Sequence, residues 1–300
     1  MRYVFIVNPT AGKKNPYDTI FPKIQQYFGN SGLEYHYHTT KAPLHATELV
    51  QSEAAKGDAV RIFAVGGDGT LSETAAGAIG EKNVEIGIIP CGSGNDYIKT
   101  FGEQEAFLSF DKQLGAASHP VDMIRSGEQL SINVCSIGLD AKVAYNMVPF
   151  KKIPFVSGSM AYNMALVKTL LGKIGTQLEV TIDGDKKFEG NYLFALAGSG
   201  KFYGGGYCGA PQAIPDDGLL DFILIKKPPL IQIPSLVPIY KAGDHLTFEK
   251  FKDILTFCRG KSMEITALRP AVANFDGECH FIDKVGFQVI PKAVNFIVPV

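Results

Sequence analysis

The chain has 300 residues, of which 46% are hydrophobic and 20% charged, and its 29 basic and 30 acidic side chains leave a formal net charge of -1. This composition is typical of a globular protein and excludes disordered, collagen-like and fibrous classes. The balanced charge argues against a general nucleic-acid binder, whose surface carries an excess of Lys and Arg. The five cysteines form no C-x-x-C pair, so neither a disulfide framework nor a thiolate zinc site is favoured.

Two features of the sequence bear on the compartment. The longest uncharged stretch, between Lys152 and Lys168, has fifteen residues and includes Pro154 and Asn163. It is shorter than the roughly 18 apolar residues that a membrane-spanning helix needs. The N-terminus runs directly into an apolar strand-like segment, without the pattern of a signal peptide. The sequence therefore predicts a cytoplasmic protein without a transmembrane segment.

Residues 1–122 alternate strand-like and helical segments, which is typical of a parallel sheet covered by helices. Helices are expected where apolar residues recur at three- and four-residue spacing. The predicted strands are residues 3–7, 35–38, 59–65 and 84–89, and the predicted helices are residues 17–28, 44–56 and 71–79.

Beyond residue 122 the strands become more frequent, and their apolar residues alternate with a period of two, as in 178–182 and 222–224. One helix is expected at residues 159–171 and a second, short one after Pro229. No Ser/Gly-rich linker separates the two halves. The sequence predicts a mostly antiparallel β domain at residues 123–291 that packs against the first domain, with a cleft between them.

A glycine-rich turn follows the third predicted strand, in the order Gly66-Gly67-Asp68-Gly69-Thr70, before a helix resumes at Leu71. At the carboxyl end of a parallel strand, glycines let backbone N–H groups approach a phosphate, and the next helix adds partial positive charge. A carboxylate would repel a bare phosphate, so Asp68 indicates a Mg²⁺ ion between the two. The alternative is a tight turn in which Asp68 caps the helix.

Two further polar loops follow neighbouring strands. The turn Pro90–Asp96 contains Gly92-Ser93-Gly94, which on its own is a common loop. The loop Asn8–Lys14 offers backbone donors, a hydroxyl and two ammonium groups. It has the spacing neither of a Walker A loop nor of G-x-G-x-x-G, which weakens an oxidoreductase interpretation.

The combination of these motifs resembles the diacylglycerol kinase catalytic domain family, in its bacterial lipid kinase branch. The turn Gly66–Thr70 alone is shared with NAD kinases and sphingosine kinases, whereas the motifs of the second half point to lipid kinases. The motifs that carry the resemblance are Asn8-Pro9-x-x-Gly12, Gly66–Thr70, Pro90-x-Gly92-Ser93-x-Asn95-Asp96, Val121-Asp122, Tyr203-Gly204-Gly205-Gly206, Ala210-Pro211-x-Ala213-x-Pro215-Asp216-Asp217-Gly218-Leu219-Leu220-Asp221 and Asp276-Gly277-Glu278.

The resemblance implies a Rossmann-like nucleotide-binding α/β domain followed by a β-sandwich domain, with the active site in the interdomain cleft and the last strand, near residues 292–300, returning to the first domain. It also implies ATP as a cofactor, bound by sixteen residues. These are Asn8, Pro9, Thr10, Ala11, Gly12, Lys13, Thr40, Gly66, Gly67, Asp68, Gly69, Thr70, Leu71, Ser72, Gly92 and Ser93. Related sequences often have Asn at the position of Ser72.

The same resemblance implies the catalytic and metal residues. Asp68, Asp96 and Asp122 would form a water and Mg²⁺ network at the phosphates, and Glu278 would be the base for the lipid hydroxyl. The residues alone leave a second interpretation of the Glu278 motif, as a β-hairpin turn. A structural Mg²⁺ would be bound by the Asp217 carboxylate and the backbone carbonyls of Ile214 and Leu219.

The expected function is therefore that of an ATP-dependent lipid kinase, which transfers the γ-phosphoryl group to the hydroxyl of a diacylglycerol-like lipid and yields phosphatidate. The enzyme would be cytoplasmic and would associate transiently with the membrane surface; a homodimer is left open. One alternative is a kinase for another lipid alcohol, such as sphingosine or phosphatidylglycerol. The other is a non-catalytic nucleotide- or lipid-binding regulator of the same fold.

Overall fold

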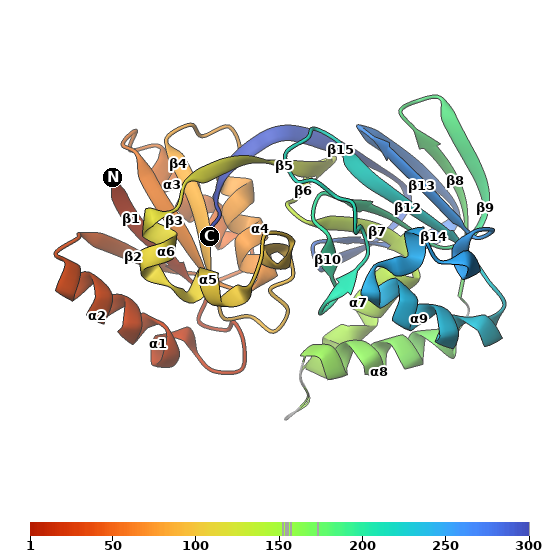
Figure 1. The fold of residues 1–300 in the computed structure, drawn as a ribbon, viewed down its shortest axis with the longest axis horizontal. Helices are drawn as coiled ribbons and strands as arrows, with labels where there is room; N and C mark the ends of the chain where they lie inside the picture. Colours follow the sequence, from red (N-terminus) through yellow and green to blue (C-terminus); the bar gives the residue numbers. More distant parts are fainter. Residues whose placement is uncertain (152, 154–155, 157, 173, 300) are drawn as a thin grey trace. The chain divides into compact units, whose positions relative to one another are not determined.

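The computed structural model describes residues 1–151, 153, 156, 158–172 and 174–299 (Figure 1). The chain forms two compact units. The first comprises Met1–Val121 together with Lys292–Val300, and the second comprises Asp122–Pro291. Because two separate segments build the first unit, its sheet includes a strand from the far end of the sequence.

The first unit contains a parallel sheet with the strand order β15-β4-β3-β1-β2. The last part of β15 lies beside β4, where Asn295 pairs with Glu85 and Phe296 with Ile86. Each predicted strand is present within one or two residues of its expected bounds. The strands are β1 (Arg2–Val7), β2 (Tyr35–Thr39), β3 (Val60–Gly66), β4 (Val84–Pro90) and β15 (Glu278–Ile297).

Helices connect these strands, as the alternating pattern predicts. The helix expected at residues 17–28 is divided in two at Ile20, because Pro22 has no N–H group to donate within a continuous helix. The helix expected at 71–79 begins earlier, at Asp68. The helices of this unit are α1 (Pro16–Thr19), α2 (Phe21–Ser31), α3 (His45–Ala54), α4 (Asp68–Gly77), η1 (Tyr97–Thr100), α5 (Gln104–Leu108) and α6 (Phe110–Gly115).

The second unit is built on an antiparallel sheet with the order β13-β12-β9-β7-β14-β15, in which β8 also pairs with β9 and β14. The long strands β9 and β14 each pair with β8 along their first half and with β7 along their second half. The strands are β7 (Val134–Gly138), β8 (Thr176–Ile182), β9 (Lys186–Gly198), β12 (Leu220–Lys226), β13 (Leu255–Gly260) and β14 (Ser262–Phe275). Shorter strands are β5 (Ser118–Ser126), β6 (Gln129–Ser131), β10 (Phe202–Tyr203) and β11 (Tyr207–Cys208).

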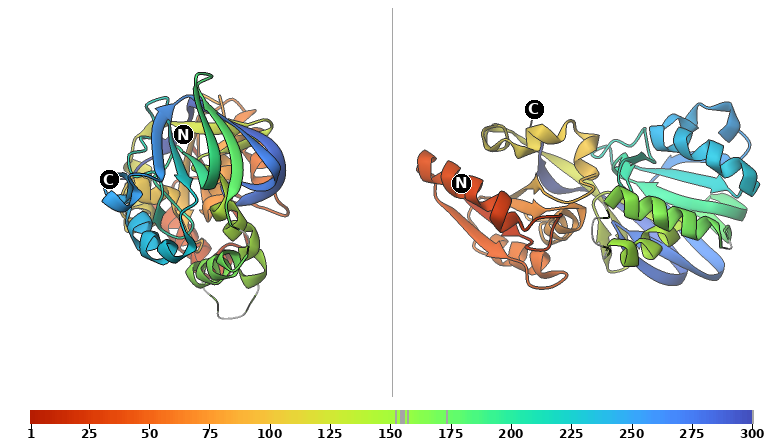
Figure 2. Two further views of the ribbon diagram at one scale, coloured as in Figure 1. Left: turned by 90° about the vertical axis from the view of Figure 1, so that its right-hand side faces the viewer. Right: turned by 90° about the horizontal axis from the view of Figure 1, so that it is seen from below.

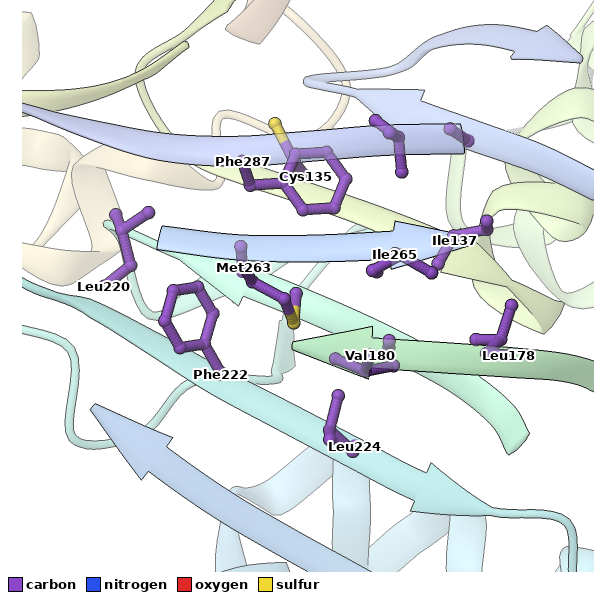
Figure 3. Close-up of a cluster of buried hydrophobic side chains, with 14 of the residues drawn as sticks. Cys135, Ile137, Leu178, Val180, Leu220, Phe222, Leu224, Met263, Ile265 and Phe287 are labelled. Atoms are coloured by element: carbon purple, nitrogen blue, oxygen red, sulfur yellow. The ribbon is translucent and has the colours of Figure 1, made fainter. Parts of the chain in front are cut away.

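Apolar side chains fill both faces of this sheet. Along β12, Phe222 and Leu224 pack into one core, and the alternating Ile223 and Ile225 pack into another. The first core lies among the strands (Figure 3). It includes Cys135, Ile137, Leu178, Val180, Leu220, Met263, Ile265 and Phe287.

The second core lies beneath a layer of helices that covers the other face of the sheet (Figures 1 and 2). The helices expected at 159–171 and after Pro229 are present as α8 (Gly158–Leu170) and α9 (Ile233–Ala242). A third helix, α7 (Leu139–Lys151), was not expected from the sequence. Three short turns of 3-10 helix, η2 (Leu230–Gln232), η3 (Asp244–Leu246) and η4 (Glu249–Phe251), complete the layer.

No helix in the described part of the chain is both long enough and apolar enough to cross a bilayer.

Candidate active site

The predicted nucleotide-binding loops of the first unit leave the same edge of its sheet, because they follow the carboxyl ends of parallel strands. Backbone hydrogen bonds hold these loop starts side by side. The N–H of Asn8 donates to the carbonyl of Val65 at 3.0 Å, and the N–H of Thr40 donates to that of Val7 at 2.9 Å. The N–H of Cys91 donates to the carbonyl of Gly66 at 2.9 Å.

The two glycine-rich turns touch each other through their backbones. A Cβ atom placed on Gly92 would lie 2.5 Å from the Cα of Gly67, which is too close for any side chain. A Cβ on Gly66 would likewise lie 2.3 Å from the hydroxyl oxygen of Thr70. Gly67 and Gly92 are therefore required for the contact between the turns, and Gly66 for the close approach of Thr70 within its own turn, in addition to any approach of a phosphate.

The loop after β1 is tied to the same place. The side-chain amide of Asn8 donates to the hydroxyl of Thr70 at 3.0 Å, and its oxygen accepts hydrogen bonds from the N–H and hydroxyl of Thr10. Gly12 has a φ of +76°, and a Cβ there would lie 2.1 Å from the carbonyl oxygen of Cys91. The three loops after β1, β3 and β4 thus form one packed cluster.

Helix α4 begins inside the Gly66–Thr70 turn. Its N-cap is Gly67, which has no side chain with which to cap the first turn. Asp68 is the first residue of the helix and not its N-cap, which was the alternative interpretation of the motif. The uncapped N-terminus of a ten-residue helix is a place where backbone N–H groups and the helix dipole favour a phosphate.

Asp68 instead connects the two turns. Its Oδ1 accepts hydrogen bonds from the backbone N–H groups of Asp96, at 2.6 Å, and Tyr97, at 3.3 Å. A Cβ placed on Gly94 would lie 2.8 Å from Oδ2 of Asp68 and 3.3 Å from Oδ2 of Asp96. The two carboxylates therefore border the same small space.

This pair of carboxylates suits Mg²⁺. Mg²⁺ is commonly bound through one or two carboxylates, with phosphate oxygens and water completing its shell. Among the residues that the structure describes, no three or more His, Cys, Asp or Glu side chains are grouped so that they could hold a metal ion together, so the protein would supply only part of the coordination. Lys99 also belongs to this site, because its Nζ lies 2.5 Å from Oδ1 of Asp96. The sequence analysis did not identify Lys99, and the only sign of this ion pair in the sequence is that Lys99 follows Asp96 by three residues.

Other predicted nucleotide residues differ in their exposure. Ser93 is exposed, as are Gly12 and Lys13 at the tip of the first loop. Leu71 is fully buried and Ser72 is 9% exposed within α4. Leu71 therefore contributes to the core of the unit, and a contact with nucleotide could involve only its backbone.

Asp122, the third predicted carboxylate, belongs to the second unit and is fully buried. Its Oδ2 accepts a hydrogen bond from the N–H of Gly218 at 2.7 Å, and its own N–H donates to the carbonyl of Pro215 at 2.6 Å. Asp122 thus fixes the loop that contains the predicted structural metal site.

In that loop, Asp217 has a cationic side chain as its partner. Its Oδ2 accepts from Nη2 of Arg259 at 2.7 Å, and its Oδ1 accepts from the N–H of Leu219 at 3.0 Å. Arg259 also donates from Nε to Asp221 at 2.8 Å. The guanidinium group supplies the positive charge that a Mg²⁺ ion would otherwise supply, so Mg²⁺ binding by Ile214, Asp217 and Leu219 stays a prediction. Nothing in the sequence pairs Arg259 with a carboxylate 42 residues earlier.

Glu278 is exposed and begins β15, opposite Phe275 in the hairpin with β14. The two turn residues, Asp276 and Gly277, have φ values of +48° and +103°, as a type I′ turn requires. The hairpin interpretation of this motif is therefore correct, and it leaves the Glu278 carboxylate on the surface of the unit. Asp276 has a structural role, since its carboxylate accepts the backbone N–H groups of Ile132, Asn133 and Val134.

Comparison with known proteins matches both units. Residues 2–126 match the family described as "Diacylglycerol kinase catalytic domain". Residues 133–298 match the family described as "YegS C-terminal NAD kinase beta sandwich-like domain". These matches confirm the predicted order of an α/β domain and a β-sandwich-like domain.

Similar proteins cover most of the chain. A "Diacylglycerol kinase" of Bacillus subtilis is 27% identical over 280 residues, which are 91% of this chain and 88% of that protein. A "Probable lipid kinase YegS-like" of Shewanella frigidimarina is 28% identical over 256 residues, covering 83% of this chain and 79% of that protein.

A crystal structure described as a diacylglycerol kinase from Bacillus anthracis has the same fold. It superposes with a TM-score of 0.72 at 22% identity, covering 99% of this chain and 96% of the other. The glycine-rich loop cluster, the two domain matches and the similar proteins agree. The chain belongs to the bacterial lipid kinase family that joins a diacylglycerol kinase catalytic domain to a YegS C-terminal domain, and it is an ATP-dependent phosphotransferase.

Proposed function

We propose that the enzyme transfers the γ-phosphoryl group of ATP to the hydroxyl of a diacylglycerol. In this reaction the lipid oxygen forms a bond to the γ-phosphorus, the bond from that phosphorus to the β,γ-bridging oxygen breaks, and ADP leaves. The hydroxyl proton passes to a base, and the lipid product is phosphatidate. We further propose that the enzyme meets its lipid at a membrane surface, with which it associates transiently.

The packed cluster of three loops carries this proposal. Phosphoryl transfer requires positioned donors and neutralised charge more than covalent chemistry by the protein. The uncapped N-terminus of α4 and the touching turns at Gly67 and Gly92 provide backbone N–H groups for the phosphates. Asp68 and Asp96 border one space and would hold the Mg²⁺, which supplies charge neutralisation at the phosphates when bound.

The family resemblance described above assigns the remaining roles. Asp122 would extend the network of carboxylates, and Glu278 would accept the hydroxyl proton. A glutamate carboxylate can act as a base when it lies within hydrogen-bond reach of the hydroxyl. The position of the active site between the two domains stays a prediction.

The test is transfer of labelled phosphate from ATP to a panel of lipid alcohols in mixed micelles. Diacylglycerol should be phosphorylated faster than sphingosine or phosphatidylglycerol. A preference for either of the latter would overturn the diacylglycerol assignment and keep the kinase. If the protein binds ATP but phosphorylates no lipid in the panel, the result would favour the alternative of a non-catalytic nucleotide- or lipid-binding regulator.

The role of Glu278 is tested separately with Glu278→Gln. The amide cannot take the proton, so kcat should fall for every acceptor while ATP affinity stays the same. Glu264→Gln is a matched control, because the Glu264 side chain is also exposed, at 67%, on the preceding strand. Equal rates for Glu278→Gln and the parent would refute the base role even if the kinase assignment stands.

A further inference from the structure

The second unit contains a cavity between its sheet and its layer of helices. Fifteen residues line it, and all of them lie between residues 139 and 251. They come from α7, α8, β9, β10, β11, β12, α9 and η4. Ten are aliphatic side chains or phenylalanine, four are tyrosines, and the remaining one is Asp140. Such walls suit an apolar ligand with one polar group.

The open space in the cavity is small. It amounts to about 50 Å³, which is room for roughly four groups the size of a water molecule. A ligand that fits without rearrangement is therefore a short stretch of alkyl chain. Two of the lining residues, Leu166 on α8 and Val237 on α9, are only partly buried, so the helices form the side through which a longer chain would leave.

Asp140 is an unusual residue for such a wall. It is 5% exposed, and its carboxylate oxygens make no hydrogen bond of good geometry, although the Ser136 hydroxyl and the backbone N–H groups of Asp140 and Ala141 lie close to them. The two nearby tyrosine hydroxyls, of Tyr203 and Tyr240, lie 3.1 Å apart and hydrogen-bond to each other. A buried carboxylate that its neighbours stabilise only in part is costly, so its presence in an apolar wall points to a ligand that supplies a hydrogen-bond donor.

The outer face of the helix that lines this cavity is also apolar. On α8, Met160, Met164 and Val167 are 52%, 39% and 60% exposed and lie on one side of the helix. The opposite side, with Tyr162 and Leu166, lines the cavity. A helix that is apolar on both sides is normally buried in a protein or in lipid, so an apolar ligand can approach the cavity along this helix.

The polar end of the cavity lies next to the hairpin that carries Glu278. The Sγ of Cys279 contacts the carbonyl oxygen of Ala141 at 3.6 Å. Glu278 directly precedes Cys279 in the sequence, and Asp140 directly precedes Ala141, so both carboxylates lie one residue away from this contact. A hydroxyl held at Asp140 would belong to a lipid whose head lies close to this hairpin.

We propose that this cavity binds the alkyl chain of a lipid alcohol and that Asp140 accepts a hydrogen bond from a hydroxyl group of that lipid. The proposal rests on the proposed function, because it concerns how the acceptor of the kinase is recognised. An ionised carboxylate accepts hydrogen bonds and donates none, which excludes alkyl esters and ethers without a hydroxyl as equally good ligands. Asp140 is thus a positioning residue for the acceptor.

The experiment uses photolabelling of the full chain without ATP. The probe is a 1-O-alkylglycerol with a diazirine in its chain, and labelled peptides are identified by mass spectrometry. Label is expected on residues of α7, α8 and α9 that line the cavity. Val237→Phe, which fills the cavity, should lower the labelling at least ten-fold. Leu268→Phe, a similar substitution at an exposed position on β14 that does not line the cavity, should leave it unchanged.

The role of Asp140 is measured with a second probe, in which both hydroxyls of the glycerol are capped as methyl ethers. Asp140→Leu should weaken binding of the alcohol probe roughly ten-fold or more, as expected for loss of a hydrogen bond to a charged group, and should change binding of the ether probe less than two-fold. Equal effects on both probes would show a structural role and overturn the proposal. Labelling that Val237→Phe does not reduce would overturn it as well.

These outcomes are separable from the proposed function. Labelling of the cavity in a protein that phosphorylates no lipid would refute the kinase assignment and keep the binding site. Phosphorylation of diacylglycerol without labelling of the cavity would refute the binding site and keep the kinase.

Discussion

Burial of Asp140 predicts an unusual dependence of stability on pH. Desolvation raises the pKa of Asp140 from 3.8 to about 6, and the Ser136 hydroxyl and the backbone N–H groups of Asp140 and Ala141 offset only part of that rise. The charged and titratable groups that face it are the hydroxyls of Tyr203 and Tyr240, whose own pKa values are raised well above 10 by burial. No cation therefore stabilises the ionised form in the described surroundings of this carboxyl group.

The sign follows from linkage. Between pH 4 and 6 the folded protein binds more protons at Asp140 than the unfolded chain does, so this group stabilises the fold at low pH and loses that effect as pH rises through 6. A difference of roughly 2 pKa units corresponds to about 3 kcal/mol. At pH 7 the ionised carboxylate thus costs the folded state about 3 kcal/mol relative to pH 4.

His245 acts in the same pH range with the opposite sign. Burial lowers its pKa from 6.5 to about 4, so its contribution is present above pH 6.5 and is lost as pH falls towards 4, again by about 3 kcal/mol. The two groups nearly cancel in the parent protein. The effect of Asp140 therefore appears only in the difference between the parent and Asp140→Asn, because His245 is common to both.

The assay is urea unfolding followed by circular dichroism, at several values between pH 4.5 and 7.5. The free energy of unfolding of Asp140→Asn, measured relative to the parent, should increase by 2 to 3 kcal/mol, in round figures, from the lowest to the highest pH. The absolute difference at one pH is less informative, because a buried amide has its own desolvation cost. A difference that stays constant with pH would refute the reasoning.

Three further predictions concern the loops. Gly12→Ala should destabilise the first unit by about 2 kcal/mol or more, since φ is positive and a Cβ would collide with the Cys91 carbonyl. Gly69→Ala is the control, because a Cβ added at Gly69 would meet no atom within 4 Å. Equal unfolding curves for the two variants would contradict the close packing at Gly12. Asp68→Asn should change the free energy of unfolding by no more than about 1 kcal/mol, because the amide oxygen still accepts both backbone N–H groups, whereas turnover should fall roughly 10²-fold. Turnover equal to that of the parent would refute the proposed role of Asp68 at the phosphates. Asp217→Ala should lower the Tm through loss of the Arg259 ion pair, and it should also abolish any rise of Tm with added Mg²⁺; a rise that persists in the variant would place the ion elsewhere.

Local patterns in the sequence predicted much of the first unit. Strands β1, β3 and β4 are short apolar runs that end in glycine or polar turns, and both signals depend only on neighbouring residues. The start of α4 was placed three residues too late, because the glycines of the Gly66–Thr70 turn resemble a loop although Gly69 lies in the first helical turn. Helix α7 was missed because its sequence contains Pro149, which is unusual inside a helix, and because its apolar residues are not confined to one side.

Contacts between distant residues could not be predicted in this way. The motif identified Asp68 as a phosphate-site carboxylate, but its hydrogen bonds to Asp96 and Tyr97 depend on how two loops pack. Likewise, the sequence gives no sign that Arg259 would neutralise Asp217. The burial of Asp140 depends on three helices that meet over one sheet, which no local pattern encodes.

The shared strand β15 has a consequence for synthesis of the chain. Its last part, at Asn295 and Phe296, covers one side of β4 in the first unit, although the rest of that unit's sheet is encoded before residue 91. On the ribosome, β4 would therefore present an unpaired edge until Asn295 and Phe296 emerge, and such edges promote aggregation. A chain truncated before Lys292 should keep the strands of the second unit yet aggregate through the first.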